Sequence, residues 1–373
     1  MQQGQTYERY HRQMILGDFG EEAQLKLRKA SILVAGAGGL GCPALLYLTG
    51  AGIGRIGIID GDKVSLDNLH RQVIFTMDDI GQSKAEAAAR RLSLLNPEIG
   101  FFAYPFRLTV PVCIDLFREY DVVLDCTDNF ATRYMINDAC VLLGKPLVSA
   151  AVSRYEGTLA VFNEQRETGA TMNYRDIFPS PPKEGEVMSC AEAGILGMLA
   201  GMFGTMQAAE AFKLITGIGE TLSDRMITYD MRENRFTELL MDSSMRNGKD
   251  APADIETYLA TDYALLCEGM REPGEIDAGE FERMLLEPGV QVIDVREEDE
   301  LPAIEEFDHL RIPISVIDRS IGRIVAGKVL FVCQSGQRSR QAAALISRLM
   351  PHPPVTYSLR GGILGWKQAQ KNN

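Results

Sequence analysis

One cysteine stands between a strand-like and a helix-like segment. Residues 328–332, which are apolar after Lys328, predict a buried strand, and residues 340–349 predict a helix. Successive amides in a short loop between them can turn inward and stabilise a thiolate or a persulfide. Arg338 adds positive charge. The candidate nucleophile loop therefore comprises Cys333, Gln334, Ser335, Gly336, Gln337, Arg338 and Ser339.

A second cysteine, Cys190, follows a loop rich in proline and glycine. The Gly/Ala/Met-rich stretch from Ser189 to about Leu214 predicts a helix, and a thiol at a helix N-terminus gains thiolate character. A packing role for Cys190 stays open, because free cysteines are usually small core residues. The remaining cysteines lie in apolar settings and are expected to pack: Cys42, Cys113, Cys126, Cys140 and Cys267.

A glycine-rich turn indicates a phosphate site. Gly36, Gly38 and Gly41, with Gly39 between them, fit the pattern G-x-G-x-x-G between a predicted strand and a predicted helix. Asp60 ends the next apolar run, where a carboxylate can accept hydrogen bonds from a ribose. Asp62 follows it. The pattern suits any mononucleotide or dinucleotide.

Polar residues that could bind phosphate follow at intervals. Asn68, Arg71 and Gln72 lie in a dense polar stretch, and Lys84 lies in the first turn of a helix that Ser83 is placed to cap. A cation is unfavourable there unless it meets an anion or is solvated.

A carboxylate follows the predicted strand at residues 121–126. Asp128 and Asn129 come where strand carboxyl ends face a ligand crevice. Asp128 is therefore a candidate ligand for Mg²⁺ on phosphates, with capping of the next helix as the alternative.

Length and composition indicate two domains. The 373 residues carry a net charge of −13, which argues against nucleic acid or an anionic membrane as partner. No apolar stretch is long enough for a membrane span, and the odd number of scattered cysteines suits a reducing compartment, so we expect a cytoplasmic protein. The pattern predicts an α/β fold, with a doubly wound domain at 1–245, a linker with a short helix at 246–273, and a smaller α/β domain at 274–373.

Several motifs in order resemble the ThiF/MoeB/HesA branch of the ubiquitin-activating superfamily. They are Arg12 in its Arg-Tyr-His-Arg-Gln context, the glycine loop, Asp60 with Asp62, Asn68 to Gln72, Lys84, and Cys126 to Asn129. The resemblance implies a Rossmann-like adenylation domain that uses ATP and Mg²⁺ to activate the C-terminal carboxylate of a ubiquitin-like carrier ending in Gly-Gly.

The resemblance also implies residue roles. Asp60 would hold the ribose, Arg71, Gln72 and Lys84 the phosphates, and Asp128 the magnesium ion. Arg12 would enter the partner subunit's site, which implies a homodimer. Cys190 matches the family cysteine that can join the carrier through an acyl disulfide, although members differ in their dependence on it.

The sequence departs from the family at its structural zinc site. Many members hold zinc with two Cys-x-x-Cys pairs, but here the first context reads Asn173 to Pro179 without cysteine, and no second pair occurs between Arg232 and Asp254. We therefore expect no such zinc.

The C-terminal part resembles single-domain rhodaneses. The resemblance rests on Ile293 to Arg296, the Cys333 loop and Leu359 to Trp366, with a departure at residues 307–315. It implies a persulfide on Cys333, supplied by a cysteine desulfurase or by thiosulfate.

Together these features predict an adenylyltransferase that also transfers sulfur to give a carrier thiocarboxylate, in molybdopterin, thiamine or another sulfur pathway. One alternative is a conjugation activator that forms a carrier thioester on Cys190, with a regulatory rhodanese domain. Others are a nicotinamide-dependent oxidoreductase and a non-catalytic module that binds a carrier.

Overall fold

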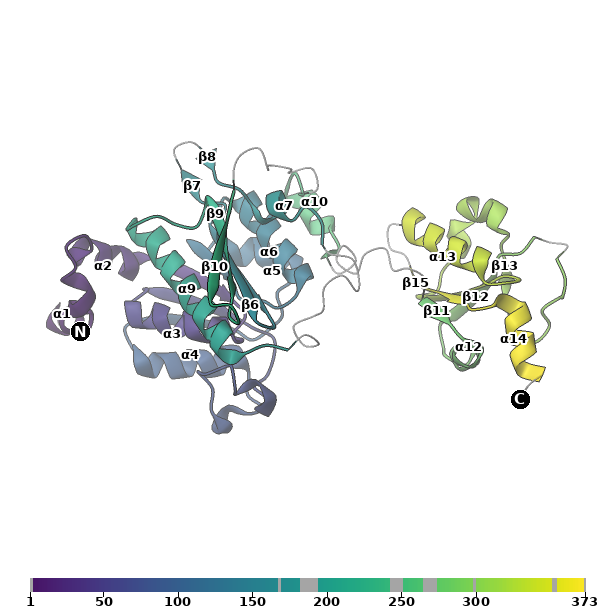
Figure 1. Cartoon of the computed structure of the whole chain (residues 1–373), viewed down its shortest axis with the longest axis horizontal. Helices are drawn as coiled ribbons and strands as arrows, with labels where there is room; N and C mark the ends of the chain where they lie inside the picture. The colour runs from purple at the N-terminus through teal and green to yellow at the C-terminus, as the bar shows by residue number, and fades with distance from the viewer. Residues whose placement is uncertain are drawn as a thin grey trace. The chain divides into compact units, whose positions relative to one another are not determined.

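The computed structural model describes residues 3–166, 169–181, 194–241, 251–263, 274–297, 300–350 and 354–371. The chain divides into two compact units, Met1–Cys267 and Glu268–Asn373. Each unit contains one large sheet with helices on both faces (Figure 1). The α/β class predicted from the alternation of apolar runs and helical segments is confirmed.

An eight-stranded sheet forms the centre of the first unit, in the order β10-β9-β6-β5-β4-β1-β2-β3. Strands β5, β4, β1, β2 and β3 are parallel, whereas β6, β9 and β10 join by antiparallel pairing. The strands are β1 (Ser31–Ala35), β2 (Arg55–Ile59), β3 (Gly100–Tyr104), β4 (Val122–Asp125), β5 (Leu147–Ser153), β6 (Glu156–Phe162), β9 (Arg225–Asp230) and β10 (Arg235–Leu240), with a separate hairpin of β7 (Gln165–Arg166) and β8 (Gly169–Ala170).

The register of the parallel strands brings the predicted ligand residues to one edge of the sheet. Ala35, the last residue of β1, pairs with Ile59 of β2 and with Asp125 of β4. The segments that follow these strands therefore begin side by side. They carry the glycine turn, Asp60 and the residues around Asp128.

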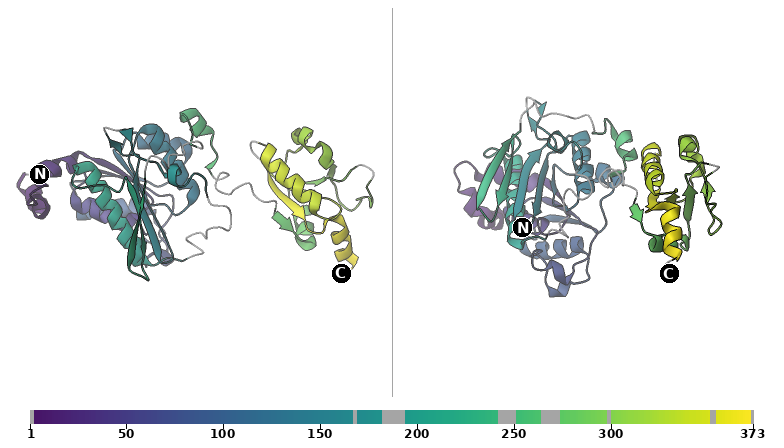
Figure 2. Two further views of the ribbon diagram at one scale, coloured as in Figure 1. Left: turned by 45° about the horizontal axis from the view of Figure 1, so that its top comes forward. Right: turned by 45° about the vertical axis from the view of Figure 1, so that its right-hand side comes forward.

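Helices cover both faces of this sheet (Figure 2). Helices α2, α3, α4 and α9 share one hydrophobic core, and α5, α6, α7 and α10 share the other. The apolar faces of these helices are buried in both cores, and such burial is the main favourable contribution to folding. The helices are α1 (Gln3–Met14), α2 (Gly20–Lys29), α3 (Gly41–Ala51), α4 (Lys84–Leu95), α5 (Val110–Phe117), α6 (Phe130–Leu143), α7 (Tyr174–Ile177), α9 (Gly197–Thr216) and α10 (Ile255–Ala260).

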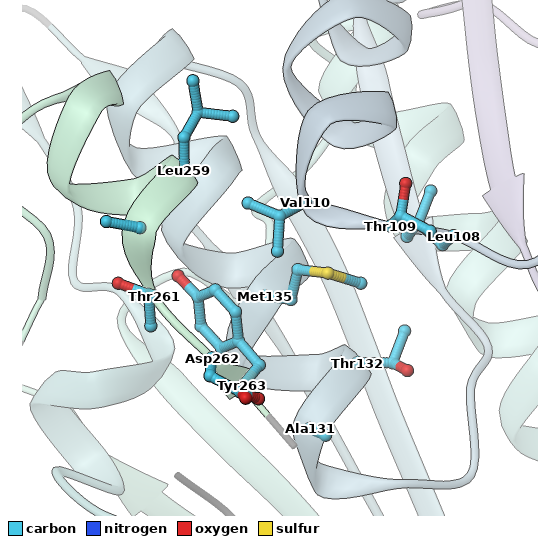
Figure 3. Close-up of a pocket in the computed structure, with 11 residues that line it drawn as sticks. Leu108, Thr109, Val110, Ala131, Thr132, Met135, Leu259, Thr261, Asp262 and Tyr263 are labelled. Atoms are coloured by element: carbon cyan, nitrogen blue, oxygen red, sulfur yellow. The ribbon is translucent and has the colours of Figure 1, made fainter. Parts of the chain in front are cut away.

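The short helix predicted in the connection is α10, and it packs on the first unit. Asp254 caps it by accepting a hydrogen bond from the amide of Thr257 at 2.8 Å. The Tyr258 hydroxyl donates to the carbonyl of Met135 on α6 at 3.2 Å, and the ring is fully buried. A shallow cavity of about 440 Å³ lies between α10, α6 and the start of α5 (Figure 3). Its lining is mainly aliphatic and hydroxyl-bearing, so the predicted chemistry-bearing residues gather elsewhere.

A five-stranded parallel sheet forms the second unit, in the order β11-β15-β14-β12-β13. One face is covered by α13 and two 3-10 turns, and the other by α12 and α14. The strands are β11 (Gly274–Ile276), β12 (Val290–Asp294), β13 (Leu310–Arg311), β14 (Lys328–Val332) and β15 (Val355–Leu359), and the helices are α12 (Ala278–Leu285), α13 (Gln337–Leu349) and α14 (Gly362–Lys371). As predicted, Cys333 lies in the turn from β14 into α13.

Candidate active sites

A pocket of about 1380 Å³ lies at the carboxyl ends of the parallel strands in the first unit. Open parallel sheets bind ligands at this place. The pocket brings together most of the residues predicted from sequence, contributed by four separate segments of the chain. They are Gly36, Gly38, Gly39, Asp60, Asp62, Asn68, Arg71, Gln72, Lys84, Asp128 and Asn129.

The glycines of the turn serve two different purposes. Gly36 has a φ of +98°, and a Cβ there would stand 2.8 Å from the carbonyl oxygen of Cys126. A Cβ on Gly41, the first residue of α3, would stand 1.9 Å from the carbonyl oxygen of Gly36. These two glycines allow the strand and helix to pack closely. Gly38 has no atom closer than 3.9 Å to such a Cβ, so the backbone there is open to a ligand.

Asp60 is fixed by backbone amides at the end of β2. Its carboxylate accepts hydrogen bonds from the amide of Ala37 and from the amide of Asp62, both at 2.8 Å. Burial raises the pKa of Asp60, while these amides and the charge of Lys84 act in the opposite direction. The Asp60 carboxylate is therefore fixed in position at the pocket, as a group that binds a ribose must be.

Lys84 is the first residue of α4, and its side chain is only 8% exposed. Its Nζ lies 3.2 Å from a carboxylate oxygen of Asp62, which compensates a cation placed against the helix dipole. Ser83 caps α4 as predicted, with its hydroxyl accepting from the amide of Glu86. Lys84 thus points into the pocket with one acidic partner and two remaining donors.

Gln72 and Arg71 enter the pocket from the polar loop after β2. Gln72 is 3% exposed, and its Oε1 has no hydrogen-bond partner among the described residues. A buried amide oxygen without a partner is costly, so a bound donor at this position would stabilise it. Arg71 is held in place because its Nη1 donates to the carbonyl of Asp67 at 2.9 Å.

The structure separates the roles of Asp128 and Asn129. Asn129 caps α6, because its side-chain oxygen accepts from the amide of Thr132 at 2.9 Å. Asp128 is exposed at the pocket and is not the capping residue. The alternative that Asp128 caps the helix is therefore wrong. Of the two roles considered for Asp128, binding a metal ion is the one that stays a prediction.

Sequence reasoning did not assign a role to the buried polar group beneath the pocket. Asp125 accepts hydrogen bonds from Nε of Arg133 at 3.1 Å and from the hydroxyls of Thr127 and Ser149. This group holds the turn that presents Asp128. The signal was available, because Asp125 ends a buried strand and so needs polar partners nearby.

Sequence reasoning also missed Arg107, which lines the pocket just after β3 and lies 3.8 Å from Asp62. The rule that ligands bind at strand carboxyl ends could have found it.

A buried ion pair supports the opposite wall of the pocket. Arg175 donates two hydrogen bonds to the carboxylate of Asp138, both at 2.7 Å, and the two side chains are 2% and 0% exposed. The Tyr263 hydroxyl also donates to Asp138 at 2.7 Å. Tyr174 and Phe178, which flank Arg175, line the pocket. The segment expected to lack the zinc ligands is thus fixed by an ion pair.

Among the predicted residues of the first unit that the structure describes, Gly41 and Arg12 do not line the pocket. Arg12 is exposed on α1 and does not line the pocket of its own chain. Cys190 and Cys267 lie outside the described residues. The prediction of one continuous helix from Ser189 to about Leu214 is wrong, because residues 194–196 are not helical and α9 begins at Gly197.

The late start of α9 follows from the conformation of the residues before it and from their pairing with a distant segment. Gly194 has a φ of +76°, and Ile195 pairs with Arg154 in an isolated bridge, so the chain is extended immediately before α9. The dipole of α9 therefore gives no reason to expect a thiolate at position 190.

The Cys333 loop forms an anion site in the second unit. The Gly336 amide donates to Sγ of Cys333 at 3.1 Å, and the Ser339 hydroxyl lies 3.4 Å from the sulfur. Burial alone raises the pKa of this thiol, but hydrogen bonds from the Ser339 hydroxyl and from loop amides outweigh it. The pKa therefore lies below the ordinary value.

The other described cysteines behave in the opposite way. Burial raises the pKa of Cys42 and Cys113 to about 12, and it also raises the pKa of Cys126 and Cys140. A raised pKa keeps a thiol protonated and inert. Among the described residues, Cys333 is therefore the only cysteine whose surroundings favour a nucleophile.

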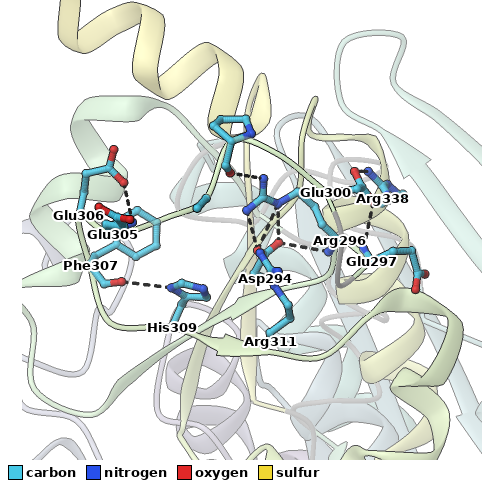
Figure 4. A network of polar contacts seen from close by, with 12 residues as sticks. Asp294, Arg296, Glu297, Glu300, Glu305, Glu306, Phe307, His309, Arg311 and Arg338 are labelled. Carbon is cyan, nitrogen blue, oxygen red and sulfur yellow. Dashed lines mark hydrogen bonds and ion pairs between the residues drawn. The ribbon is translucent and has the colours of Figure 1, made fainter.

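A network of buried charges supports the strand beside the loop (Figure 4). Asp294, at the end of β12, accepts hydrogen bonds from Nη2 of Arg296 at 2.8 Å and from Nη2 of Arg311 at 3.0 Å. Burial raises the pKa of Asp294, but the bonds from the two arginines outweigh it and lower the pKa. The residues 307–315, which depart from the rhodanese pattern, supply Arg311 to this network.

Family models match both units. The ThiF family model matches residues 10–250, and the rhodanese-like domain model matches residues 277–369. The chain belongs to the ThiF family. Its second unit is a rhodanese-like domain, as predicted from residues 293–296, the Cys333 loop and residues 359–366.

Relatives of this ThiF family member match it over nearly its whole length or over about two thirds of it. "Probable adenylyltransferase/sulfurtransferase MoeZ" from Mycobacterium tuberculosis is 40% identical and covers 97% of this chain and 93% of its own. "Sulfur carrier protein adenylyltransferase" from Thermus thermophilus is 48% identical and covers 71% of this chain and 97% of its own. The named relatives are adenylyltransferase and sulfurtransferase enzymes.

Solved structures share the fold of the ThiF unit. The structure of E. coli MccB with ATP has a TM-score of 0.52 and 23% identity, over 62% of this chain and 71% of that chain. No helix in the described part of the chain combines the length and apolar character that a bilayer crossing requires. Those same residues contain no cluster of three or more His, Cys, Asp or Glu side chains suited to a metal ion.

Proposed function

We propose that this protein adenylates the C-terminal glycine of a ubiquitin-like sulfur carrier with ATP and then converts it to a thiocarboxylate. The observation that carries the proposal is the gathering of Asp60, Arg71, Gln72, Lys84 and Asp128 in one pocket. A chain with only a packing glycine turn has no need for this set. The Cys333 thiolate site in the same chain supports the second step.

The first step needs positive charge around phosphate. The carrier carboxylate attacks the α-phosphorus of ATP, the bond to the β-phosphate oxygen breaks, and pyrophosphate leaves. Two anions meet, so Lys84 and Arg71 lower the barrier by stabilising the charge that develops. Asp60 holds the ribose. The buried Oε1 of Gln72 accepts a hydrogen bond from a donor group of the bound ligand. Bound Mg²⁺ would supply further charge neutralisation. The single carboxylate of Asp128 suits this ion, because Mg²⁺ is usually bound by one or two protein carboxylates together with the phosphates of the substrate.

The second step uses Cys333 as the sulfur donor. A persulfide on Cys333 attacks the acyl carbon, AMP leaves, and an acyl disulfide forms. A second thiol then attacks Sγ of Cys333, the sulfur–sulfur bond breaks, and the thiocarboxylate leaves on the carrier. Cys190 is the candidate second thiol, and a dithiol reductant must then reduce the resulting disulfide. Carrying both activities in one chain raises the effective concentration of persulfide near the adenylate.

The assembly and setting are part of the proposal. Arg12 lies on α1 outside its own pocket, so it would act in the partner's site of a homodimer. Free cysteines and a persulfide require a reducing setting, which favours the cytoplasm. The absence of a structural zinc stays a prediction. It is supported by the Arg175–Asp138 pair at the place where the zinc pattern is missing.

The test is carrier-dependent exchange of labelled pyrophosphate into ATP, measured with magnesium present. We expect exchange only with a carrier that ends in Gly-Gly. Exchange that is independent of any carrier, or none with every candidate carrier, would contradict the adenylation step. A stable carrier thioester on Cys190 with no thiocarboxylate would instead support conjugation.

A further inference from the structure

The Cys333 loop contains one cationic side chain, Arg338, and that cation is already paired. Its guanidinium donates to both oxygens of Glu300, with Nη2 2.5 Å from Oε2 (Figure 4). The backbone amide of Glu297 also donates to Glu300, at 2.9 Å. The carboxylate is thus fixed from two sides, and the fork geometry is the strongest form of such a pair.

The pair is neutral at physiological pH. Hydrogen bonding from Arg338 lowers the pKa of Glu300 to about 2, so the carboxylate stays ionised. Glu300 in turn raises the pKa of Arg338, and the negative charge of Cys333 contributes a smaller amount in the same direction. Arg338 is therefore near enough to interact with the thiolate, but its charge is cancelled by Glu300.

Other arginines on the surrounding elements also bind carboxylates, two arginines to each carboxylate, so each of these groups keeps one net positive charge. Asp294 binds Arg296 and Arg311, and Glu275 binds Arg340 and Arg360. What stabilises negative charge at Sγ is instead the set of loop amides and the Ser339 hydroxyl. These donors suit a single negative charge on sulfur.

Sulfur donors differ in the charge they bring. Thiosulfate is a dianion: when Sγ attacks its outer sulfur, the sulfur–sulfur bond breaks and sulfite leaves with two negative charges. A thiol persulfide, R–S–SH, brings at most one charge at the reacting sulfurs. Attack on its outer sulfur forms the Cys333 persulfide and releases the thiol. Only thiosulfate requires an uncompensated cation near Sγ.

We propose that Glu300 determines donor specificity, by neutralising Arg338 so that the Cys333 loop takes sulfur from a thiol persulfide rather than from thiosulfate. This inference rests on the proposed sulfur-transfer function, because it concerns how Cys333 is loaded. It assigns a role to an acidic residue that lies outside the loop and does not touch the sulfur. Glu300 is a specificity-determining residue, not a catalytic one.

The experiment compares loading rates of Cys333 in the full-length protein with two donors, the persulfide of free cysteine and thiosulfate. Intact mass reports the added sulfur. In Glu300→Gln, we expect the thiosulfate rate to rise roughly tenfold and the persulfide rate to stay within about twofold. The gain should disappear at high ionic strength, because it arises from an exposed charge.

Glu306→Gln is the matched control, since Glu306 pairs with Lys367 at 2.7 Å and not with Arg338. It removes the same charge from the same region, and both rates should stay unchanged. Equal loss of both rates in Glu300→Gln would mean a structural role and would overturn the inference. So would an equal rise in Glu306→Gln, or a wild type that prefers thiosulfate. Failure of wild type to load from either donor would overturn the sulfur-transfer function itself.

Discussion

The amide of Gly336 donates a hydrogen bond to Sγ of Cys333 over 3.1 Å. Residue 336 has a φ of +92°, which L residues rarely adopt, so glycine is favoured where the chain turns into α13 directly after this amide donor. Together with the Ser339 hydroxyl, this amide favours the charged form of a buried thiol. The reactivity of the protein toward electrophiles should therefore centre on this sulfur.

Reaction of Cys333 with iodoacetamide should rise with pH around a midpoint below that of an ordinary thiol. The pKa of Cys333 is lowered, so its thiolate already forms at pH values where free cysteine is protonated. Ser339→Ala removes a donor to the thiolate and should move the midpoint to higher pH. Peptide mapping by mass spectrometry gives the rate at each pH. Ser335→Ala is the control, because the Ser335 side chain is exposed and the backbone amide by which it bonds to the sulfur is kept. An unchanged midpoint in Ser339→Ala would contradict the origin of the shift.

Lys84→Met should lower carrier adenylation by roughly a hundredfold, because a buried cation that meets developing phosphate charge is lost. Pyrophosphate exchange at saturating carrier measures the effect. Lys26→Met, at an exposed pair with Glu22 on α2, should leave exchange unchanged. Full exchange by Lys84→Met would remove Lys84 from the phosphate site.

Asp128→Asn should cause a loss of exchange comparable to that of Lys84→Met and should raise the magnesium concentration needed for half-maximal exchange.

Arg12→Ala and Lys84→Ala should each be inactive alone and should regain activity when mixed. In a homodimer with Arg12 acting in trans, a mixed dimer contains one intact site, so random mixing restores about a quarter of wild-type activity. Mixing after reversible dissociation, followed by pyrophosphate exchange, tests this. No recovery, with subunit exchange verified by mass, would mean that Arg12 does not act in the partner's site.

Arg175→Met should destabilise the first unit by about 3–5 kcal/mol, since it leaves Asp138 buried without its main partner. Urea unfolding followed by tyrosine fluorescence measures the change. Arg232→Met, at an exposed pair with Asp230, should cost about 1 kcal/mol or less. A loss as small as that of the control would show that the Arg175–Asp138 pair does not stabilise the wall of the pocket.

Much of the site could be predicted because it depends on local pattern. The glycine turn, Asp60 and Asp128 all follow apolar runs, and parallel strands bring such positions together. The Cys333 loop was equally predictable from one strand–loop–helix pattern. The fold class followed from the same alternation of segments.

Other features could not be predicted because they depend on long-range contacts. The pairing of Asp138 with Arg175 and with Tyr263 joins segments far apart in sequence. Glu300 lies 38 residues before Arg338, and nothing local marks it as a partner. The start of α9 was predicted too early, because the bridge between Ile195 and Arg154 that keeps the chain extended is not visible in sequence.

The most direct test is the intact mass of a carrier ending in Gly-Gly after incubation with the protein, magnesium-ATP, a thiol persulfide and a dithiol reductant. We predict a mass increase that corresponds to replacement of one oxygen by sulfur. It should be present with wild type and absent with Cys333→Ala, while pyrophosphate exchange by Cys333→Ala stays intact. The same mass increase with Cys333→Ala, or adenylation without any sulfur gain in wild type, would contradict the sulfurtransferase function.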